Sequence, residues 1–145
     1  MDLQFVEVET PEDFDVYMQL RKQVFCGEQG VPESLEIERE DECWHFLVRQ
    51  AGHVVATGRV LPIANDAAKI QRVAVRKDAR RQGIGAELMR HMEGIAAERG
   101  RTRLLLHAQV DAVPFYEALG YEVTGASFVE ANIVHYPMRK GLAGG

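Results

Sequence analysis

The chain has 145 residues, enough to bury one hydrophobic core and too few for two, so the sequence predicts a single domain over residues 1–145. A formal net charge of -5 argues against nucleic acid as a partner, because no general basic excess is present to contact phosphates. No apolar run approaches the length of a membrane span, no signal-peptide pattern begins the chain, and two cysteines are too few for a disulfide framework. These features predict a cytoplasmic protein with no membrane partner.

The N-terminal half is predicted to contain one helix and four strands. Alternating apolar residues predict a strand over residues 3–8, and Thr10 and Pro11 then suit the N-cap and first turn of a helix. Residues 25–40 are acidic and are interrupted by glycine and proline, so an irregular segment is expected there. Three strands follow as an antiparallel meander, at residues 44–49, 53–61 and 69–75.

The C-terminal half alternates helices and strands. Apolar residues at helical spacing predict a helix from Ile84 to the region of Gly100, with Glu93 away from its buried face. The apolar stretch 103–107 predicts a central strand buried on both faces. The remaining elements complete an α+β fold with a mixed, mainly antiparallel twisted sheet flanked by helices: a short helix at residues 112–119 and strands at residues 121–124 and 133–139.

The connection between the third meander strand and the long helix has the composition of an anion site. A basic loop opens the helix through Gly83 and Gly85. Glycines leave backbone N–H groups accessible at a helix N-terminus, where the helix dipole adds partial positive charge, and Arg80 and Arg81 add full charges. A dinucleotide-binding fingerprint would need a third glycine at Leu88, and the chain has no P-loop sequence. The pattern suits a pyrophosphate, and a plain glycine joint between strand and helix is the alternative.

Two motifs occur in chain order around the apolar strand. The first is the glycine loop, R-x-x-G-x-G, and the second is F-Y-E-x-x-G-Y, made by Phe115, Tyr116, Glu117, Gly120 and Tyr121. Alone, the second motif also fits an amphipathic helix with aromatic core residues and a glycine cap. Together, separated by one helix and one strand, the motifs resemble the GNAT superfamily, the N-acetyltransferases that transfer an acetyl group from acetyl-CoA to an amine.

The resemblance implies a fold with a splayed central strand pair, acetyl-CoA as cosubstrate and an amine as acceptor. Metal is not expected, because no His, Cys or Asp cluster has ligand spacing. Tyr116 matches the family's general acid, since a phenol with a pKa of about 10 is protonated at neutral pH and can donate to a departing thiolate. The positions that match the cofactor site are Val73, Ala74, Val75, Arg80, Arg81, Gln82, Gly83, Ile84, Gly85, Ala86 and Phe115.

The general base is less well defined by the sequence. Many relatives carry a carboxylate on the strand that enters the glycine loop, whereas this chain has Gln71 and Arg72 there. We expect His107 to face the cofactor cleft as a catalytic residue, and a water relay is an equal alternative. The titratable candidates are His45, His107, Glu28 and the pair Glu130 and His135.

The remaining sequence resembles the ElaA-like and YjcF-like branch of the family. The acidic segment 28–42 lies where family members build the acceptor site, and it either attracts a cationic amine or forms a solvated loop. Family members commonly dimerise through their C-terminal strands, so a homodimer is possible. The residues that carry the resemblance are Leu20, Arg21, Val24, Phe25, Glu28, Gln29, Pro32, Glu36, Glu38, Asp41, His45, Glu130, Ile133 and His135.

Two functions from different classes fit this sequence. One is an enzyme that transfers acetyl from acetyl-CoA to a primary amine of a small molecule or peptide by direct attack. The other is a non-catalytic acyl-CoA-binding or regulatory module that kept the fold and lost the chemistry. Tyr116 favours the enzyme, while the missing strand carboxylate leaves the module as the alternative.

Overall fold

The computed structural model describes residues 2–37 and 39–142. Glu38 of the branch resemblance and the glycine-rich end from residue 143 onward lie outside the described residues. The helical elements are α1 (Pro11–Arg21), the π-helical η1 (Lys22–Glu28), α2 (Glu33–Glu36), η2 (Glu40–Glu42), η3 (Lys77–Ala79), α3 (Ile84–Glu98), η4 (Val110–Ala112) and α4 (Val113–Ala118). The strands are β1 (Leu3–Glu7), β2 (Trp44–Gln50), β3 (His53–Pro62), β4 (Ala67–Val75), β5 (Arg103–Gln109), β6 (Glu122–Val123), β7 (Phe128–Glu130) and β8 (Ile133–Gly141). No helix in this described part is long and apolar enough to cross a membrane.

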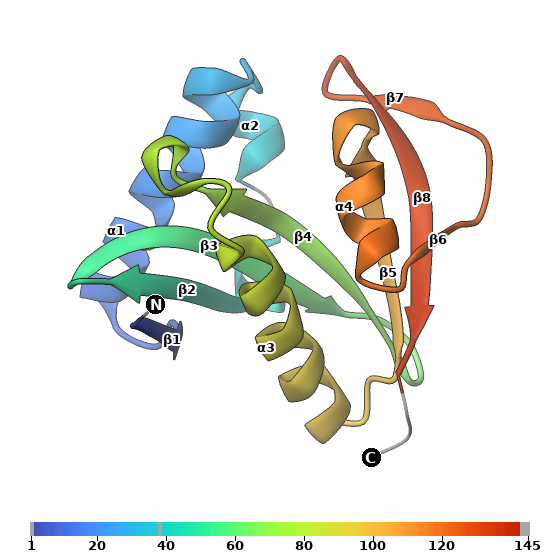
Figure 1. Ribbon diagram of the computed structural model, residues 1–145, viewed down its shortest axis with the longest axis horizontal. Coiled ribbons are helices and arrows are strands. Elements are labelled where there is room, and N and C mark those ends of the chain that lie inside the picture. Colours follow the sequence, from blue (N-terminus) through green and yellow to red (C-terminus); the bar gives the residue numbers. More distant parts are fainter. Residues whose placement is uncertain (1, 38, 143–145) are drawn as a thin grey trace.

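The strands form one mixed sheet in the order β1-β2-β3-β4-β5-β8-β6, with β7 paired to β8 (Figure 1). The pairings are antiparallel apart from that of β4 with β5. Helix α3 packs on one face of β2, β3 and β4, and α1 packs behind β3 and β4 on the other face (Figure 1). The predicted α+β fold with a mainly antiparallel sheet is confirmed.

The central strands β4 and β5 meet at one end and diverge at the other, as Figure 1 shows. They are in register only over residues 67–70 and 103–106. Beyond that point β4 has two residues, Arg72 and Val73, where β3 has only Gly58, and Arg72 adopts a φ of 57°. A bulge of this kind bends a strand and increases its twist, so β4 turns away from β5. The predicted splayed pair is confirmed, and the bulge explains it.

The N-terminal helix begins as predicted, but the segment after it is more regular than expected. Thr10 Oγ1 accepts a hydrogen bond from the Asp13 N–H at 3.1 Å, which caps the first turn. The chain then continues as the π-helical η1 as far as Glu28, and α2 follows. The expectation of an irregular segment over 25–40 is therefore wrong for residues 25–28, 33–36 and 40, and it holds at residues 29–32, 37 and 39. Buried Val24 packs against α1 and β4, and this packing outweighs the low helix propensity of Gly27, the glycine that lies within η1.

Helix α3 approaches the sheet closely on one face. Met92 is fully buried, and a Cβ on Gly58 of β3 would lie 2.8 Å from its sulfur and terminal methyl, so any larger residue there would displace the end of the Met92 side chain. Glu93 is also buried, contrary to the expectation that it lies away from the packed face. Its carboxylate accepts hydrogen bonds from the Tyr121 hydroxyl at 2.7 Å and from Lys140 Nζ at 2.9 Å. Tyr121 precedes β6 and Lys140 lies in β8, and these two distant partners satisfy the hydrogen-bonding groups of the carboxylate. The local helical pattern does not reveal them.

Strand β5 is buried on one face rather than on both. Leu104, Leu106 and Ala108 are buried, and they alternate with half-buried His107 and Gln109. The expectation of two buried faces is wrong, because His107 and Gln109 on the second face line a cavity and are not packed in the core.

The chain before β8 contains a strand that the sequence did not predict. β7 pairs with β8 as a hairpin, from Phe128 opposite His135 to Glu130 opposite Ile133. The turn residues Ala131 and Asn132 both adopt positive φ, as a two-residue hairpin turn requires. This hairpin brings Glu130, Ile133 and His135, three residues of the branch resemblance, into the neighbourhood of β5.

Candidate functional site

A cavity of about 420 Å³ lies where β4 and β5 separate. Its walls come from η1 and the segment that follows it, from the two splayed strands, from η4 and α4, and from the β7–β8 hairpin. Both predicted catalytic residues, Tyr116 and His107, line this cavity, and so does Val73 of the predicted cofactor site. The fold thus brings together residues that come from separate sequence motifs.

Tyr116 reaches the cavity from α4. Its ring packs edge-on against Phe115 and Tyr121, with centroid separations of 5.0 and 5.9 Å. Burial raises the pKa of Tyr116 to about 12, so the phenol is protonated at neutral pH. A protonated hydroxyl beside the cavity can act as a hydrogen-bond and proton donor.

His107 lies on the open face of β5, where it was expected. Its Nδ1 is 3.3 Å from Oε2 of Glu130, and the Phe128 ring packs edge-on against it at 4.8 Å. Burial lowers the pKa of His107 and the charge of Lys69 lowers it further, while Glu130 raises it. The net lowering keeps the imidazole neutral at neutral pH, as a proton acceptor must be.

The loop before α3 has the backbone that its sequence predicts. Arg81 and Gly83 adopt φ of 65° and 81°, and Gly83 is the N-cap without a capping side chain. The first N–H groups of α3 are thereby left to bind another partner. Ile84 differs from its neighbours, because its side chain is buried in the core and only its backbone faces the loop. The other residues of the predicted cofactor site in this loop and in the first turn of α3 are exposed or half-buried: Arg80, Arg81, Gln82, Gly83, Gly85 and Ala86.

Arg80 is held between two elements. Its Nη2 donates to Glu28 Oε2 at 2.6 Å, and its Nε donates to the Val75 carbonyl oxygen at 2.9 Å. Arg80 therefore ties the end of β4 to η1. The same contact engages Glu28, which is not among the described residues that line the cavity.

The two predicted family motifs meet at Gly85. A Cβ added there would lie 3.4 Å from Phe115 Cζ and 3.5 Å from Val75 Cγ2. The N-terminus of α3, the end of β4 and the first aromatic residue of α4 therefore converge. Val73 and Val75 are half-buried against the main core, and Ala74 between them is buried against η1.

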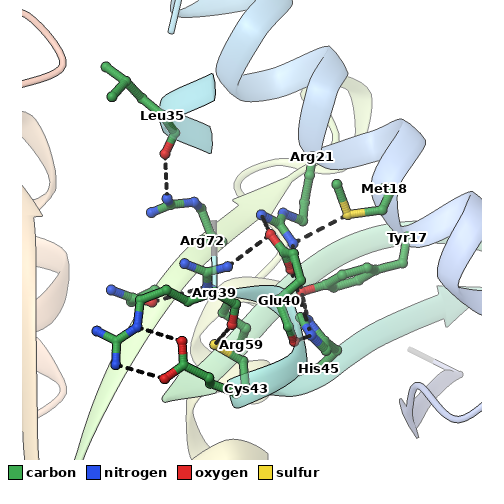
Figure 2. Close-up of polar contacts among 12 residues, drawn as sticks. Tyr17, Met18, Arg21, Leu35, Arg39, Glu40, Cys43, His45, Arg59 and Arg72 are labelled. Carbon is green, nitrogen blue, oxygen red and sulfur yellow. Dashed lines mark hydrogen bonds and ion pairs between the residues drawn. The ribbon is translucent and has the colours of Figure 1, made fainter. Parts of the chain in front are cut away.

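Sequence reasoning missed a cluster of buried charges beside the cavity, shown in Figure 2. The fully buried side chains of Arg21 and Arg59 converge on Glu40, at 2.8 and 2.7 Å from Arg21 and 2.9 Å from Arg59. Arg59 also donates to Gln71 Oε1 at 3.0 Å, and Gln71 lines the cavity. The cluster thus extends to the strand position where many relatives carry a carboxylate. Its only sequence signal is an arginine inside the apolar strand β3.

His45 belongs to this cluster and not to the cavity. The Tyr17 hydroxyl lies 2.7 Å from His45 Nδ1, and His45 Nε2 lies 2.6 Å from the Glu40 carbonyl oxygen (Figure 2). Because a carbonyl can only accept, Nε2 carries the proton and the Tyr17 hydroxyl donates to Nδ1. Burial lowers the pKa of His45, which fits this neutral tautomer. Both ring nitrogens are occupied, so His45 has no lone pair to offer a substrate.

Four carboxylates among the described residues of the acidic segment 28–42 pair with basic side chains. Beyond the contacts of Glu28 and Glu40, Glu33 lies 3.2 Å from Lys22 and Glu42 lies 2.8 Å from Arg39. What this segment gives to the described cavity wall is uncharged: Gln29, Val31 and Leu35. Within the described residues, these contacts favour a folded acidic loop over a carboxylate-lined amine site.

The described residues contain no group of three or more His, Cys, Asp or Glu side chains arranged to hold a metal ion. Cys26 and Cys43 are not joined in a disulfide, and both are half-buried. Burial raises the pKa of the Cys43 thiol, so it is a weak nucleophile at neutral pH.

Comparison with known proteins establishes the family. The GNAT acetyltransferase domain family matches residues 6–142. The uncharacterized N-acetyltransferase YjcF of Bacillus subtilis is 37% identical over 123 residues, covering 83% of this chain and 87% of YjcF. An acyl-CoA N-acyltransferase from Pseudomonas aeruginosa has a TM-score of 0.80 at 26% identity, with 97% of this chain and 99% of that chain covered. ElaA of Escherichia coli shares the fold, with a TM-score of 0.84 at 23% identity over 96% of this chain and 98% of ElaA.

The chain therefore belongs to the GNAT acetyltransferase family. Members of this family transfer an acyl group from an acyl-CoA, and acetyl-CoA is the family's cosubstrate. The predicted resemblance is confirmed, and both names of the predicted branch occur among the similar proteins.

Proposed function

We propose that residues 1–145 act as one N-acetyltransferase domain that transfers acetyl from acetyl-CoA to a primary amine by direct attack. The observation that carries this proposal is that Tyr116 and His107 line one cavity where β4 and β5 separate. A proton donor and a proton acceptor are what the reaction needs, since the attacking amine loses a proton and the departing thiolate gains one.

The end of β4, the N-terminus of α3 and Phe115 form the part of the site that fits acetyl-CoA. When bound, acetyl-CoA supplies the acetyl group as a reactive thioester. The splay leaves the β5 side of Val73 and Val75 without a paired strand in the described sheet, so their backbone edge can receive an extended chain. The α3 N-terminus and the exposed guanidinium of Arg81 can hold the pyrophosphate. Phe115, 37% exposed at the same place, offers an aromatic surface.

The chemical roles follow from the positions of the two catalytic candidates. His107, neutral at neutral pH, accepts the proton that the amine nitrogen loses as its lone pair attacks the acetyl carbon. Tyr116, protonated because burial raises its pKa to about 12, donates its hydroxyl proton to the departing sulfur. Both groups lie on the cavity wall, so neither has to cross the sheet to reach the reacting atoms.

A thiol-release assay with acetyl-CoA against a panel of amines tests the proposal. The panel should include polyamines, amino sugars and peptide N-termini, because the acceptor is unknown. Release of free CoA together with an acetylated amine, detected by mass spectrometry, is the expected result. Binding of acetyl-CoA without turnover on any amine would favour the non-catalytic acyl-CoA-binding or regulatory module instead.

Gly85→Val is expected to weaken acetyl-CoA binding at least about tenfold, because the new side chain fills the place where backbone approaches phosphate. Its Cβ would already lie 3.4 Å from Phe115 before the γ-methyl groups are added. Isothermal titration calorimetry measures the effect. Gly94→Val is the matched control, since it adds the same side chain to the same helix where nothing lies within 4 Å. Equal affinity of the two variants, with unchanged circular dichroism, would contradict the placement of the pyrophosphate.

A further inference from the structure

The β7–β8 hairpin places a carboxylate beside the candidate base. Glu130, at the end of β7, has Oε2 at 3.3 Å from Nδ1 of His107 on β5, although the two residues are separated by 23 positions in the chain. Phe128 of the same strand packs edge-on against His107 at 4.8 Å and stacks on His135 at 5.8 Å. The hairpin thus holds the His107 ring through one polar and one aromatic contact.

The hydrogen-bond partners determine which nitrogen of each histidine carries the proton. An ionised carboxylate can only accept, so Glu130 favours the His107 tautomer with the proton on Nδ1 and the lone pair on Nε2. His135 makes a similar contact, with Nδ1 at 2.7 Å from the Ile133 carbonyl oxygen. Both rings line the cavity, and among the described residues a carboxylate, that of Glu130, contacts the His107 ring while a backbone carbonyl contacts the His135 ring.

The charges around His107 come from three strands. Lys69 on β4 and His135 on β8 lower the pKa of His107, as does burial, while Glu130 on β7 raises it. Glu130 is therefore the group that stabilises the imidazolium which forms when His107 accepts a proton. Without that charge, His107 would be a weaker base between Lys69 and His135.

We propose that Glu130 is a positioning residue that fixes His107 with its Nε2 lone pair toward the acceptor, and that His107 then acts as the general base. This inference rests on the proposed function. The acceptor N–H proton moves to His107 Nε2 as the nitrogen lone pair forms the bond to the acetyl carbon. The carbon–sulfur bond breaks, its electron pair stays on sulfur, and the Tyr116 proton neutralises the thiolate, so no oxidant or further reactant is needed.

A nuclear magnetic resonance titration tests the Glu130–His107 contact without any acceptor. Imidazole nitrogen shifts of the wild-type protein should show the neutral His107 ring protonated at Nδ1. In Glu130→Gln the pKa of His107 should fall, because the amide keeps the shape and removes the negative charge. Glu122→Gln is the control, since Glu122 is an exposed carboxylate on neighbouring β6 that pairs with Arg139 at 2.9 Å. An unchanged pKa in Glu130→Gln, or a neutral ring protonated at Nε2, would overturn the positioning role.

The pH dependence of kcat/KM tests the catalytic consequence. A base must be deprotonated to act, so wild-type kcat/KM should rise with pH through the pKa of His107. This rising part of the pH profile is its acid limb. Glu130→Gln should shift the limb to lower pH by as much as the resonance titration shows the pKa of His107 to fall, whereas Glu122→Gln should leave the limb in place. His107→Gln should lower kcat/KM by about 10²–10⁴-fold and remove the limb, with acetyl-CoA affinity unchanged.

The outcomes separate the two proposals. A limb that does not move in Glu130→Gln, or near-normal kcat/KM in His107→Gln, would overturn the present inference while the acetyltransferase activity stood. No turnover of any amine by the wild-type protein would overturn the proposed function and the base role with it. The titration would still decide whether Glu130 sets the tautomer of His107.

Discussion

Replacement of Tyr116 by phenylalanine is expected to lower kcat by about 10²–10⁴-fold, the usual contribution of a general acid. The change keeps the ring, which packs against Phe115 and Tyr121, and removes only the hydroxyl. Folding and acetyl-CoA affinity should therefore survive, and the loss should appear in kcat. Steady-state kinetics on the identified acceptor, with calorimetry for acetyl-CoA, measures both quantities.

Tyr136→Phe is the control for this prediction, because it removes a hydroxyl from β8 at a residue outside the described cavity wall. It should leave kcat within about twofold of the wild type, because the half-buried Tyr136 does not line the cavity. The pKa of Tyr116, raised to about 12, also means that deprotonation of this group should not reduce wild-type kcat below pH 10. Near-normal kcat in Tyr116→Phe would assign the proton to solvent, and a parallel loss of acetyl-CoA affinity would make Tyr116 a binding residue.

Much of the fold follows from local sequence signals. Thr10 caps α1 as its hydroxyl and the following proline predict, and Ala51-Gly52 turns β2 into β3 with both residues at positive φ. Gly83 opens α3 with a φ of 81°, as the glycine loop predicts. In these places the chemistry that determines the conformation lies within a few residues of the conformation itself.

The features that sequence reasoning missed depend on distant partners. β7 has three residues and its turn, Ala131-Asn132, has no glycine, so neither length nor turn composition identifies the hairpin. Glu93 resembles a solvent-exposed helix residue until the fold brings Tyr121 and Lys140 to it from distant parts of the chain. Such residues are specified by tertiary packing, which a local pattern does not contain.

The candidate site likewise contains some residues that local motifs identify and others that become visible only in the folded structure. The glycine loop and Tyr116 were identified from motifs, and His107 from its place at the end of a strand. The contact of Glu130 with His107 was not predicted, because it needs the β7–β8 hairpin in register with β5. The Arg59–Gln71 contact was missed for a similar reason, since it joins neighbouring strands through a bulged pairing.

Glu40→Ala is expected to lower the free energy of unfolding by about 3–5 kcal/mol, the cost of removing one partner from a buried ion pair. Glu40 accepts hydrogen bonds from Arg21 and Arg59, two fully buried guanidiniums that lose their shared carboxylate in the variant. Its backbone carbonyl also holds His45, so the side chain and main chain of one residue fix the turn η2 to the sheet. Urea denaturation followed by circular dichroism measures the change.

Glu42→Ala provides the matched control, because Glu42 lies in the same turn but pairs with exposed Arg39. An exposed pair of this kind contributes about 0–1 kcal/mol, so the control should remain close to the wild type.

Burial alone would raise the pKa of Glu40, but the hydrogen bonds and charges of Arg21 and Arg59 hold it below its usual range. A carboxyl whose pKa is lowered by folding stabilises the native state above its unfolded pKa, and this contribution is lost as the pH falls through the folded pKa. The difference in unfolding free energy between wild type and Glu40→Gln should therefore shrink on acidification below about pH 4. A difference that stays constant from pH 7 to pH 3, or equal losses in Glu40→Ala and Glu42→Ala, would show that the buried cluster does not stabilise the fold through its charge.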